Sequence, residues 1–186
     1  MLPAWDIDLV RRAWELATRA HDGQKYGGQE QGRHIEYLNH IGAVCLEVMQ
    51  ALHHHPEAHA DLAIACAILH DTVEDTPVDL QQLETDFGPA IARGVAALTK
   101  SDDLADKHDK MIDSLQRIKN QPREVWMVKM ADRIVNLSAP PYYWDQQKII
   151  AYRAEAQLIY DHLHSASVTV SERLRAKIEA YGDYLR

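Results

Sequence analysis

The feature that most constrains this chain is a stretch without a polar side chain, "LAIACAIL", from Leu62 to Leu69. A helix that is apolar on every side has to be buried on every side. The stretch runs directly into "HDTVEDT", residues 70–76, which carries a histidine and several carboxylates. Charged groups at the end of a buried helix are costly unless they are paired or bind a metal ion. The sequence therefore predicts a central helix whose end holds a functional site.

The remaining segments also have helical patterns. Residues 6–21 place apolar side chains on one face at spacings of three and four, and a glycine-rich loop follows. Asn39 can cap a second helix that runs to about His53, and Pro56 can open a third that carries the apolar stretch. A short helix should stop at Gly88, and further helices are expected over 89–98, 105–119, 122–138, 145–164 and 167–185. No alternating pattern typical of a strand is seen, so the predicted fold is all-α.

Length and composition favour a single domain over residues 1–186, with 46% hydrophobic residues to build its core. No apolar run approaches the roughly 20 residues of a membrane helix, and the N-terminus lacks the apolar core of an export signal. Cys45 and Cys66 lie in apolar helical patterns, which is typical of small core residues in a reducing compartment. We therefore expect a cytoplasmic protein.

The formal net charge of −8, without a long basic run, argues against non-specific binding of nucleic acid. A polyanionic small-molecule substrate would need local cations or a metal ion to overcome this overall field. The apolar spacing of the last predicted helix serves packing within the chain or a homo-oligomer equally well, and both stay open.

The segment after the apolar stretch has the donors of a metal site. If the helix continues, His70 and Glu74 are four residues apart, as are Asp71 and Asp75, so all four share one surface. Imidazole nitrogen with carboxylate oxygen suits Mn, Fe or Zn, and a carboxylate left over from coordination can orient or deprotonate a water. The alternative is a solvated helix end with a buried, satisfied histidine.

A second polar group lies in "VWMVKMADRIVNL", residues 125–137. Its plainly polar members form a narrow stripe at positions i, i+3, i+4 and i+7: Lys129, Asp132, Arg133 and Asn136. A surface helix usually has a wider polar face, so this stripe favours the lining of a cleft. The alternative is an internal Asp132–Arg133 ion pair that joins two helices.

His40 is the third candidate, because the start of a helix favours the neutral imidazole that a metal ion requires. Taken alone, it would more simply be a capping or buried histidine. The run His53–His55, beside Pro56, is expected to be exposed. Together the candidates give a ligand set from three helices, which leaves room for water or a substrate oxygen on a six-coordinate ion: His40, His70, Asp71 and Asp132.

The order and spacing of four segments resemble the HD-domain (p)ppGpp hydrolases, the hydrolase halves of RelA/SpoT-type enzymes and the stand-alone small alarmone hydrolases. The segments are "YLNHIGAV", "ILHDTVEDT", "FGPAIARGVAALTK" and "VKMADRIVNL". "AHDGQKY" and "WDQQKIIAYRAEA" are also similar to family segments, and the resemblance covers roughly residues 13 to 165.

This resemblance implies a helical HD-domain bundle around one Mn²⁺ ion, with the four ligands just given. Glu74 and Asp75 match the family's pair that positions and activates the attacking water, and Asn136 matches the residue beside the ribose or base. The implied reaction removes the 3′-pyrophosphate of ppGpp or pppGpp, releasing pyrophosphate and GDP or GTP. Lysine and arginine, here Lys129 and Arg133, would stabilise developing charge. A synthetase partner does not fit in 186 residues, so hydrolysis alone is expected.

The sequence departs from the family at two places. Ile41 stands where the family commonly has proline, which alters a helix start without removing a ligand. In many relatives, an arginine two residues after a glutamine packs against the guanine base. Here Gln24 is followed by Lys25 and Tyr26, so the cation comes one position early. Tyr26 can stack on a base instead. The alternatives are therefore hydrolysis of another nucleotide or a catalytically weak nucleotide-binding module.

Four further positions stay open between site and framework. Lys100, Lys107 and Lys110 could reach phosphates or be solvated, and Trp144 could wall a pocket, although a core role is favoured.

Overall fold

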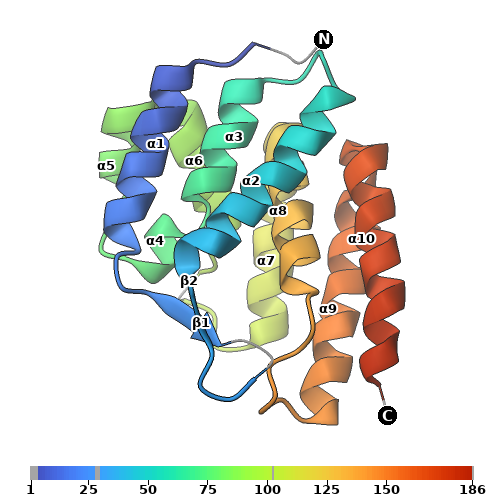
Figure 1. Ribbon diagram of the computed structural model, residues 1–186. Coiled ribbons are helices and arrows are strands. Elements are labelled where there is room, and N and C mark those ends of the chain that lie inside the picture. The colour runs from blue at the N-terminus through green and yellow to red at the C-terminus, as the bar shows by residue number, and fades with distance from the viewer. Residues whose placement is uncertain (1–3, 28–29, 102, 186) are drawn as a thin grey trace.

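The apolar stretch forms the central helix of the fold. The computed structural model describes residues 4–27, 30–101 and 103–185. Helix α3 (Ala60–Leu69) is buried at every residue except Asp61. It packs against α1 (Ile7–Ala20), α2 (Tyr37–His53), α6 (Pro89–Leu98) and α8 (Arg123–Asn136), as Figure 1 shows. The prediction of a buried central helix is thus confirmed.

The other elements follow closely from the sequence. They are α4 (Thr72–Asp75), α5 (Leu80–Phe87), α7 (Lys107–Lys119), α9 (Gln146–Leu163), α10 (Val168–Ala180) and the 3₁₀ turns His164–Ala166 and Tyr181–Tyr184. Several helices begin at a side chain that accepts hydrogen bonds from the first free backbone N–H groups: Asp6, Asp79, Asp106, Asp145 and Ser167. Acceptors at these positions explain why most boundaries could be predicted within two or three residues.

Two helix starts differ from the prediction. Helix α2 begins at Tyr37 rather than Asn39, and the Asn39 amide instead donates a hydrogen bond to the Tyr26 hydroxyl at 2.9 Å. Helix α3 begins at Ala60, because residues 56–58 form a turn after Pro56. The helix also stops at Leu69, and a turn at His70 and Asp71 leads into α4.

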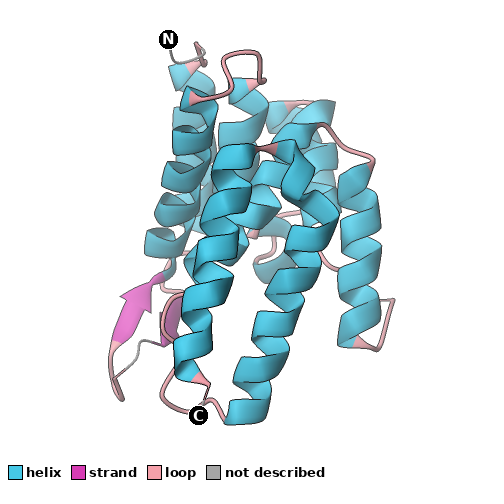
Figure 2. Ribbon diagram, turned by 90° about the vertical axis from the view of Figure 1, so that its right-hand side faces the viewer, coloured by secondary structure: helices cyan, strands magenta, loops and turns pink. Residues whose placement is uncertain are grey.

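The expectation of no strand is wrong. Strands β1 (Lys25–Gly27) and β2 (His34–Glu36) pair antiparallel, with Tyr26 opposite Ile35. Figure 2 shows the pair at one end of the helical bundle. Three residues are too few for a period of two to be recognised in a sequence. Positions 28–29 of the predicted glycine-rich loop, and residues 1–3 of the segment searched for an export signal, lie outside the described residues.

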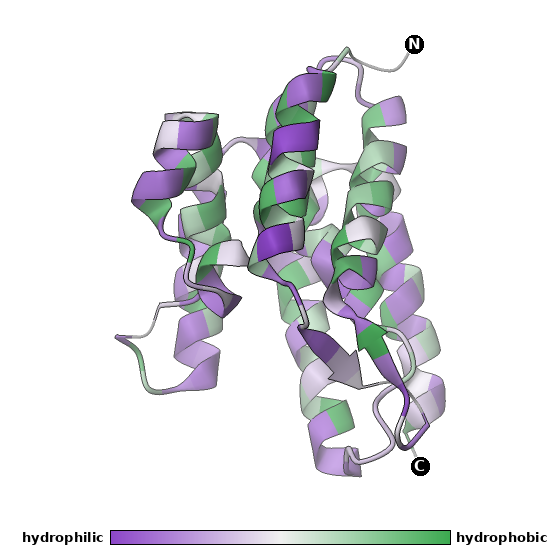
Figure 3. Cartoon of the chain, turned by 60° about the vertical axis from the view of Figure 1, so that its left-hand side comes forward, coloured by the Kyte–Doolittle hydropathy of each residue, from purple (hydrophilic) through white to green (hydrophobic). Residues whose placement is uncertain are grey.

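One hydrophobic core draws on helices from α1 to α10. Figure 3 shows mixed helices, with hydrophobic and hydrophilic residues on different sides. The apolar spacing of the last helix is used inside the chain, because Val170, Leu174, Ile178 and Tyr181 are buried. No helix in the described part of the chain is both long enough and apolar enough to span a membrane.

The central helix approaches α6 very closely at Gly94. A Cβ atom added there would lie 2.6 Å from the Sγ of buried Cys66 and 3.1 Å from a Val125 methyl group. A real Cβ atom does not fit at that distance, so the spacing of α3 and α6 depends on this glycine.

We predict that Gly94→Ala lowers the free energy of unfolding by about 2 kcal/mol, because overpacking a filled core costs about 1–3 kcal/mol. Gly42→Ala is the matched control. Its added Cβ would make an ordinary contact, 3.7 Å from Trp14, and alanine favours the helix by about 0.5–1 kcal/mol. Urea unfolding of both variants measures the difference, and equal stability of the two would refute the close packing.

Candidate metal centre and active site

Three helical segments bring the four predicted ligands together. His40 lies in the first turn of α2, His70 and Asp71 lie in the turn after α3, and Asp132 lies on α8. The Nε2 atoms of His40 and His70 are 3.2 Å apart, and His70 Nε2 is 3.0 Å from Asp71 Oδ2. Asp132 Oδ1 is 3.4 Å from His40 Nε2 and 3.9 Å from His70 Nε2. Sequence positions 40, 70, 71 and 132 therefore meet at one point.

The donor set fits a divalent ion. His40, His70 and Asp132 each offer an atom within 4.8 Å of the others. Two donors held at right angles, about 2.1 Å from one ion, lie about 3.0 Å apart, close to the observed spacings. His70 Nδ1 lies 2.8 Å from the Ala67 carbonyl, so Nδ1 carries the proton and the Nε2 lone pair faces the centre. Two imidazoles with two carboxylates suit a first-row metal ion.

The pKa values of these groups show how strongly they interact. Burial alone would lower the pKa of His40, but hydrogen bonds to Asp132 and Asp71 raise it to about 9. Burial alone would raise the pKa of Asp71 and of Asp132. Instead, His70 and His40 hold that of Asp71 well below its usual range, and Lys129 with His40 lowers that of Asp132. The carboxylates are therefore ionised and ready to bind a cation.

Glu74 and Asp75 lie on α4, directly after Asp71, and face a charged cavity. The Glu74 carboxylate accepts hydrogen bonds from the Lys100 ammonium at 2.7 Å and from the Lys100 backbone N–H at 3.0 Å. Asp75 instead accepts a weaker hydrogen bond from the Tyr37 hydroxyl at 3.3 Å. Burial, with the charges of Asp71 and Glu74, raises the pKa of Asp75. Glu74 is therefore held by a cation, whereas Asp75 is held by a neutral hydroxyl group.

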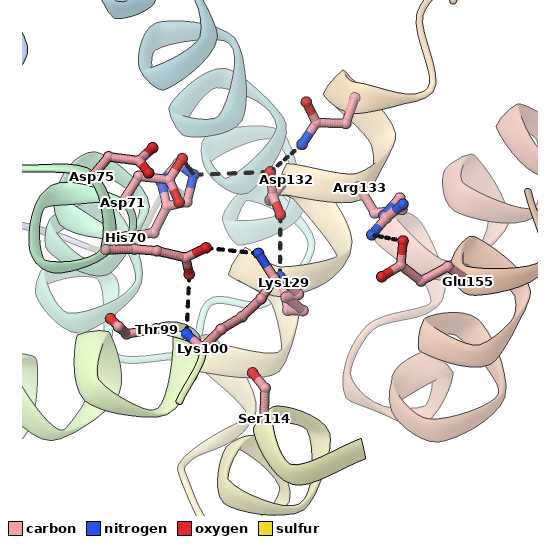
Figure 4. Close-up of polar contacts among 12 residues, drawn as sticks. His70, Asp71, Asp75, Thr99, Lys100, Ser114, Lys129, Asp132, Arg133 and Glu155 are labelled. Carbon is pink, nitrogen blue, oxygen red and sulfur yellow. Dashed lines mark hydrogen bonds and ion pairs between the residues drawn. The ribbon is translucent and has the colours of Figure 1, made fainter. Parts of the chain in front are cut away.

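The polar stripe on α8 divides between two directions. Asp132 turns toward the histidines, and it pairs with Lys129 at 3.4 Å and accepts a hydrogen bond from the Asn136 amide at 2.5 Å. Arg133 turns the other way, toward Glu155 on α9, as Figure 4 shows. The Arg133–Glu155 distance is 3.2 Å, and the guanidinium lies 4.2 Å from the centre of the Tyr152 ring. Arg133 does join two helices, but its partner is Glu155, so the alternative of an Asp132–Arg133 pair is wrong.

The Arg133 guanidinium has hydrogen-bond donors that are not paired within the described residues. Its Nε and Nη1 atoms are buried and have no hydrogen-bond partner among the described residues. Donors left in this state are costly, and they are uncommon unless a ligand or water satisfies them. Arg133 also lines the charged cavity.

Two cavities meet beside the metal centre. The charged cavity, of about 230 Å³, is lined by Tyr37, Asp71, Glu74, Asp75, Lys100, Lys129, Asp132, Arg133, Asn136, Tyr152 and Glu155. An aromatic cavity of about 250 Å³ is walled by Tyr26, Tyr143, Trp144 and the Pro140–Pro141 segment. Tyr37, Asn136 and Tyr152 line both. One space is therefore lined by charged groups of both signs, and the adjoining one is lined by aromatic rings.

The remaining candidates occupy varied places. Tyr26 lines the aromatic cavity, but Lys25 pairs with Glu36 across the hairpin at 2.8 Å and lines neither cavity. Trp144 is half-buried and walls the aromatic cavity, so it is more than a core residue.

The structure also places the three candidate lysines and the histidine run His53–His55. Among the three lysines, Lys100 lines the charged cavity, whereas Lys107 and Lys110 are not among its described lining residues. His53 and His54 are exposed as expected, but His55 is half-buried, with its Nε2 2.9 Å from the Ser167 hydroxyl.

Sequence reasoning missed Tyr37 and the pair Tyr152 and Glu155. The Tyr37 hydroxyl donates to Asp71 Oδ2 at 2.5 Å. Tyr37 stands three residues before His40, a spacing that places both on one face of α2, and this signal could have found it. Tyr152 and Glu155 lie within the segment "WDQQKIIAYRAEA", but no local pattern gives their roles, because they reach the site through the packing of α9 on α8.

Comparison with known proteins identifies the fold. Residues 13–167 match the family described as HD domain. The chain belongs to the HD domain family. The HD-domain fold predicted from the motifs is thereby confirmed, and the cluster of His40, His70 and Asp132 is a candidate site for a divalent metal ion.

Curated relatives of this HD domain differ in length. Identity is 29% to the Danio rerio protein named guanosine-3′,5′-bis(diphosphate) 3′-pyrophosphohydrolase MESH1, over 86% of this chain and 87% of that protein. Identity is 36% to the GTP pyrophosphokinase rsh of Brucella ovis, over 69% of this chain but 16% of that protein. For the bifunctional (p)ppGpp synthase/hydrolase SpoT of Escherichia coli K12, identity is 29% over 73% of this chain and 18% of that protein. The chain thus spans less than a fifth of the two longer relatives.

Solved structures agree on the architecture of this HD domain. A metazoan orthologue of SpoT that is described as hydrolysing ppGpp superposes with a TM-score of 0.79 at 21% identity, covering 96% of this chain and 98% of that one. The Listeria monocytogenes protein lmo0812 superposes with a TM-score of 0.61 at 17% identity, over 83% of this chain and 98% of that one. At these identities the likeness establishes the fold.

We predict that Asp132→Asn weakens Mn²⁺ binding by more than about 100-fold, because even partners of metal ligands contribute about 10- to 100-fold to affinity. Isothermal titration calorimetry measures the dissociation constant. Glu84→Gln on the exposed face of α5 removes a carboxylate outside the site and should leave it unchanged. Equal affinity of the two folded variants would rule out Asp132 as a ligand.

Proposed function

We propose that this HD domain hydrolyses the 3′-pyrophosphate of ppGpp or pppGpp, releasing pyrophosphate and GDP or GTP, and that its ion is Mn²⁺. The observation that carries the proposal is the meeting of His40, His70, Asp71 and Asp132 beside a cavity that holds both acids and cations. The names of the relatives support the same reaction, including one relative of which this chain spans 87%.

The four donors would hold the ion, which would polarise a phosphoryl oxygen and neutralise part of the substrate charge when bound. Soft thiolate ligands do not contribute here, because the two cysteines lie elsewhere, in α2 and α3. A set of two imidazoles and two carboxylates suits Mn²⁺, Fe²⁺ or Zn²⁺, and Mn²⁺ is the ion that the family resemblance implies.

Glu74 and Asp75 would handle the attacking water. Water would attack the phosphorus attached to the ribose 3′ oxygen, and one of the two carboxylates would take a proton from that water. The bond between this phosphorus and the 3′ oxygen would break, and the 3′ oxygen would take up a proton to become a hydroxyl group. Burial and the charges of Asp71 and Glu74 raise the pKa of Asp75, which favours Asp75 as the group that takes the proton. Glu74 would orient the water, with Lys100 fixing its carboxylate from one side.

The cations of the charged cavity would bind the two phosphates of the pyrophosphate group. Lys129 and Lys100 each bring an ammonium, and Arg133 brings the two donors that lack a partner among the described residues. Such donors act most strongly in a space that excludes water, where the charge they face is poorly screened. Together with a bound divalent ion, these groups would offset the carboxylates that line the same cavity in a chain of net charge −8.

The aromatic cavity would hold the nucleoside. Tyr26 and Tyr143 offer faces for stacking on the base, and Asn136 lies where the two cavities join, beside the expected position of the ribose. Lys25, paired with Glu36 on the hairpin, would reach a substrate only after leaving that partner.

The second candidate function is hydrolysis of another nucleotide by the same site. Tyr26 stands in the region where many family members use an arginine against guanine, and the described lining of the aromatic cavity contains no carboxylate to accept from the guanine N–H groups. A weak binding module is disfavoured, because all four ligands and both acids are in place around the cavity.

Four broader proposals accompany this function. Residues 1–186 would act as one domain, supported by the single core that links α1 to α10. A cytoplasmic location is supported by the two free cysteines. The ligand would be a small nucleotide and not a nucleic acid, because the net charge is negative. A homo-oligomer stays compatible with these observations.

We predict that the metal-free protein does not act on ppGpp, and that added Mn²⁺ gives equimolar GDP and pyrophosphate. Anion-exchange chromatography separates these products. Asp71→Ala should abolish turnover, and Asp75→Asn should lower kcat about 100-fold or more with little change in KM. Release of orthophosphate instead, or turnover of other nucleotides but not ppGpp, would favour the second candidate.

Arg133→Met should raise the KM for ppGpp about 10-fold or more, because a hydrogen bond to a charged group is worth about 1.5–3 kcal/mol. Arg173→Met is the matched control, since it breaks another arginine–glutamate pair, with Glu47, on an exposed surface. Steady-state kinetics on folded variants measures the effect. An unchanged KM in Arg133→Met would remove Arg133 from the substrate site.

A further inference from the structure

Tyr37 is an uncharged side chain whose hydroxyl lies between two carboxylates of the site. Its hydroxyl donates a hydrogen bond to Asp71 Oδ2 at 2.5 Å and lies 3.3 Å from Asp75 Oδ2. The first carboxylate belongs to the proposed ligand set and the second to the proposed water-handling pair. A single phenol therefore touches both halves of the proposed machinery.

The two carboxylates need such a partner. Asp71 and Asp75 are four residues apart on one side of the turn and α4, where like charges repel each other. Asp71 Oδ2 also has to stay near two histidine nitrogens, 3.0 Å from His70 and 3.6 Å from His40. A neutral donor between the two aspartates lowers their repulsion without adding a positive charge that would compete with a metal ion.

The Tyr37 ring is held in place from outside the metal centre. It stacks on buried His21, with 4.8 Å between ring centres and 27° between ring planes. His21 Nδ1 lies 2.6 Å from the Gln24 side-chain oxygen, and the Tyr37 backbone N–H donates to the Gln24 carbonyl at 3.0 Å. The end of α1 and the start of the hairpin thus fix where the hydroxyl points.

We propose that Tyr37 is a positioning residue for the hydrolysis, whose hydroxyl aligns Asp71 toward the histidines and Asp75 toward the charged cavity. The inference rests on the proposed function and extends it to a residue that supplies neither a ligand nor a nucleophile. It also gives the hairpin a role, because the hairpin and the end of α1 orient Tyr37. Hydrogen-bond partners that orient metal ligands contribute about 10- to 100-fold to affinity or activity.

The test is Tyr37→Phe, which keeps the ring and its stacking on His21 and removes only the hydroxyl. We expect kcat for ppGpp to fall about 10- to 100-fold, KM to change less than about threefold, and the Mn²⁺ dissociation constant to rise about 10-fold. The unfolding temperature should stay within about 2 °C, since the ring still fills its place. Tyr160→Phe, in half-buried α9 packing outside both cavities, is the matched control and should change none of these values.

A double-mutant cycle with Asp75→Asn separates positioning from a structural role. If the hydroxyl acts through Asp75, Tyr37→Phe costs less kcat in the Asp75→Asn background than in the wild-type protein. Full additivity, an unchanged kcat and Mn²⁺ affinity, or an activity loss that follows lost folding would overturn the proposal. If wild-type protein releases no pyrophosphate from ppGpp, the proposed function fails, whereas the Mn²⁺ affinity of Tyr37→Phe still tests the alignment of Asp71.

Discussion

The structure depends on the cost of placing two imidazoles and two carboxylates at the end of a buried helix. None of these groups could stay there alone, because an unpaired buried charge costs several kcal/mol. They remain because each lies within 4 Å of at least one other, with alternating charge when the histidines are protonated. A divalent ion can replace the histidine protons in this arrangement. The contacts that make the buried groups stable are therefore the same contacts that prepare them to bind a metal ion.

The surrounding fold keeps these groups at fixed spacing. Helix α3 is apolar on all sides, so it is enclosed by α1, α2, α6 and α8, two of which supply further donors to the site. Its close approach to α6 at Gly94 leaves little freedom to shift. Helix α8 directs the Asp132 side chain toward His40 and the Arg133 side chain toward Glu155 on α9, so one helix contributes to both the histidine cluster and the charged cavity.

Local chemistry explains which parts could be predicted from the sequence. The buried helix, the helix boundaries set by capping aspartates and the residues at 40, 70, 71 and 132 all have signals within a few positions of themselves. The hairpin strands are too short to show the alternating pattern of a strand. Asn39 does not cap α2 as predicted, because its side chain forms a tertiary hydrogen bond with Tyr26. Arg133's partner and the roles of Tyr152 and Glu155 depend on how α9 packs, which no local pattern encodes.

If one divalent ion organises this site, a crystal structure of the Mn²⁺-loaded protein with anomalous diffraction will show that ion. We expect a single strong anomalous peak that marks one ion. This ion should lie about 2.0–2.3 Å from each of four ligand atoms: His40 Nε2, His70 Nε2, one Asp71 oxygen and one Asp132 oxygen. A peak at another cluster, or none at saturating Mn²⁺ with the four side chains still in mutual contact, would contradict this expectation.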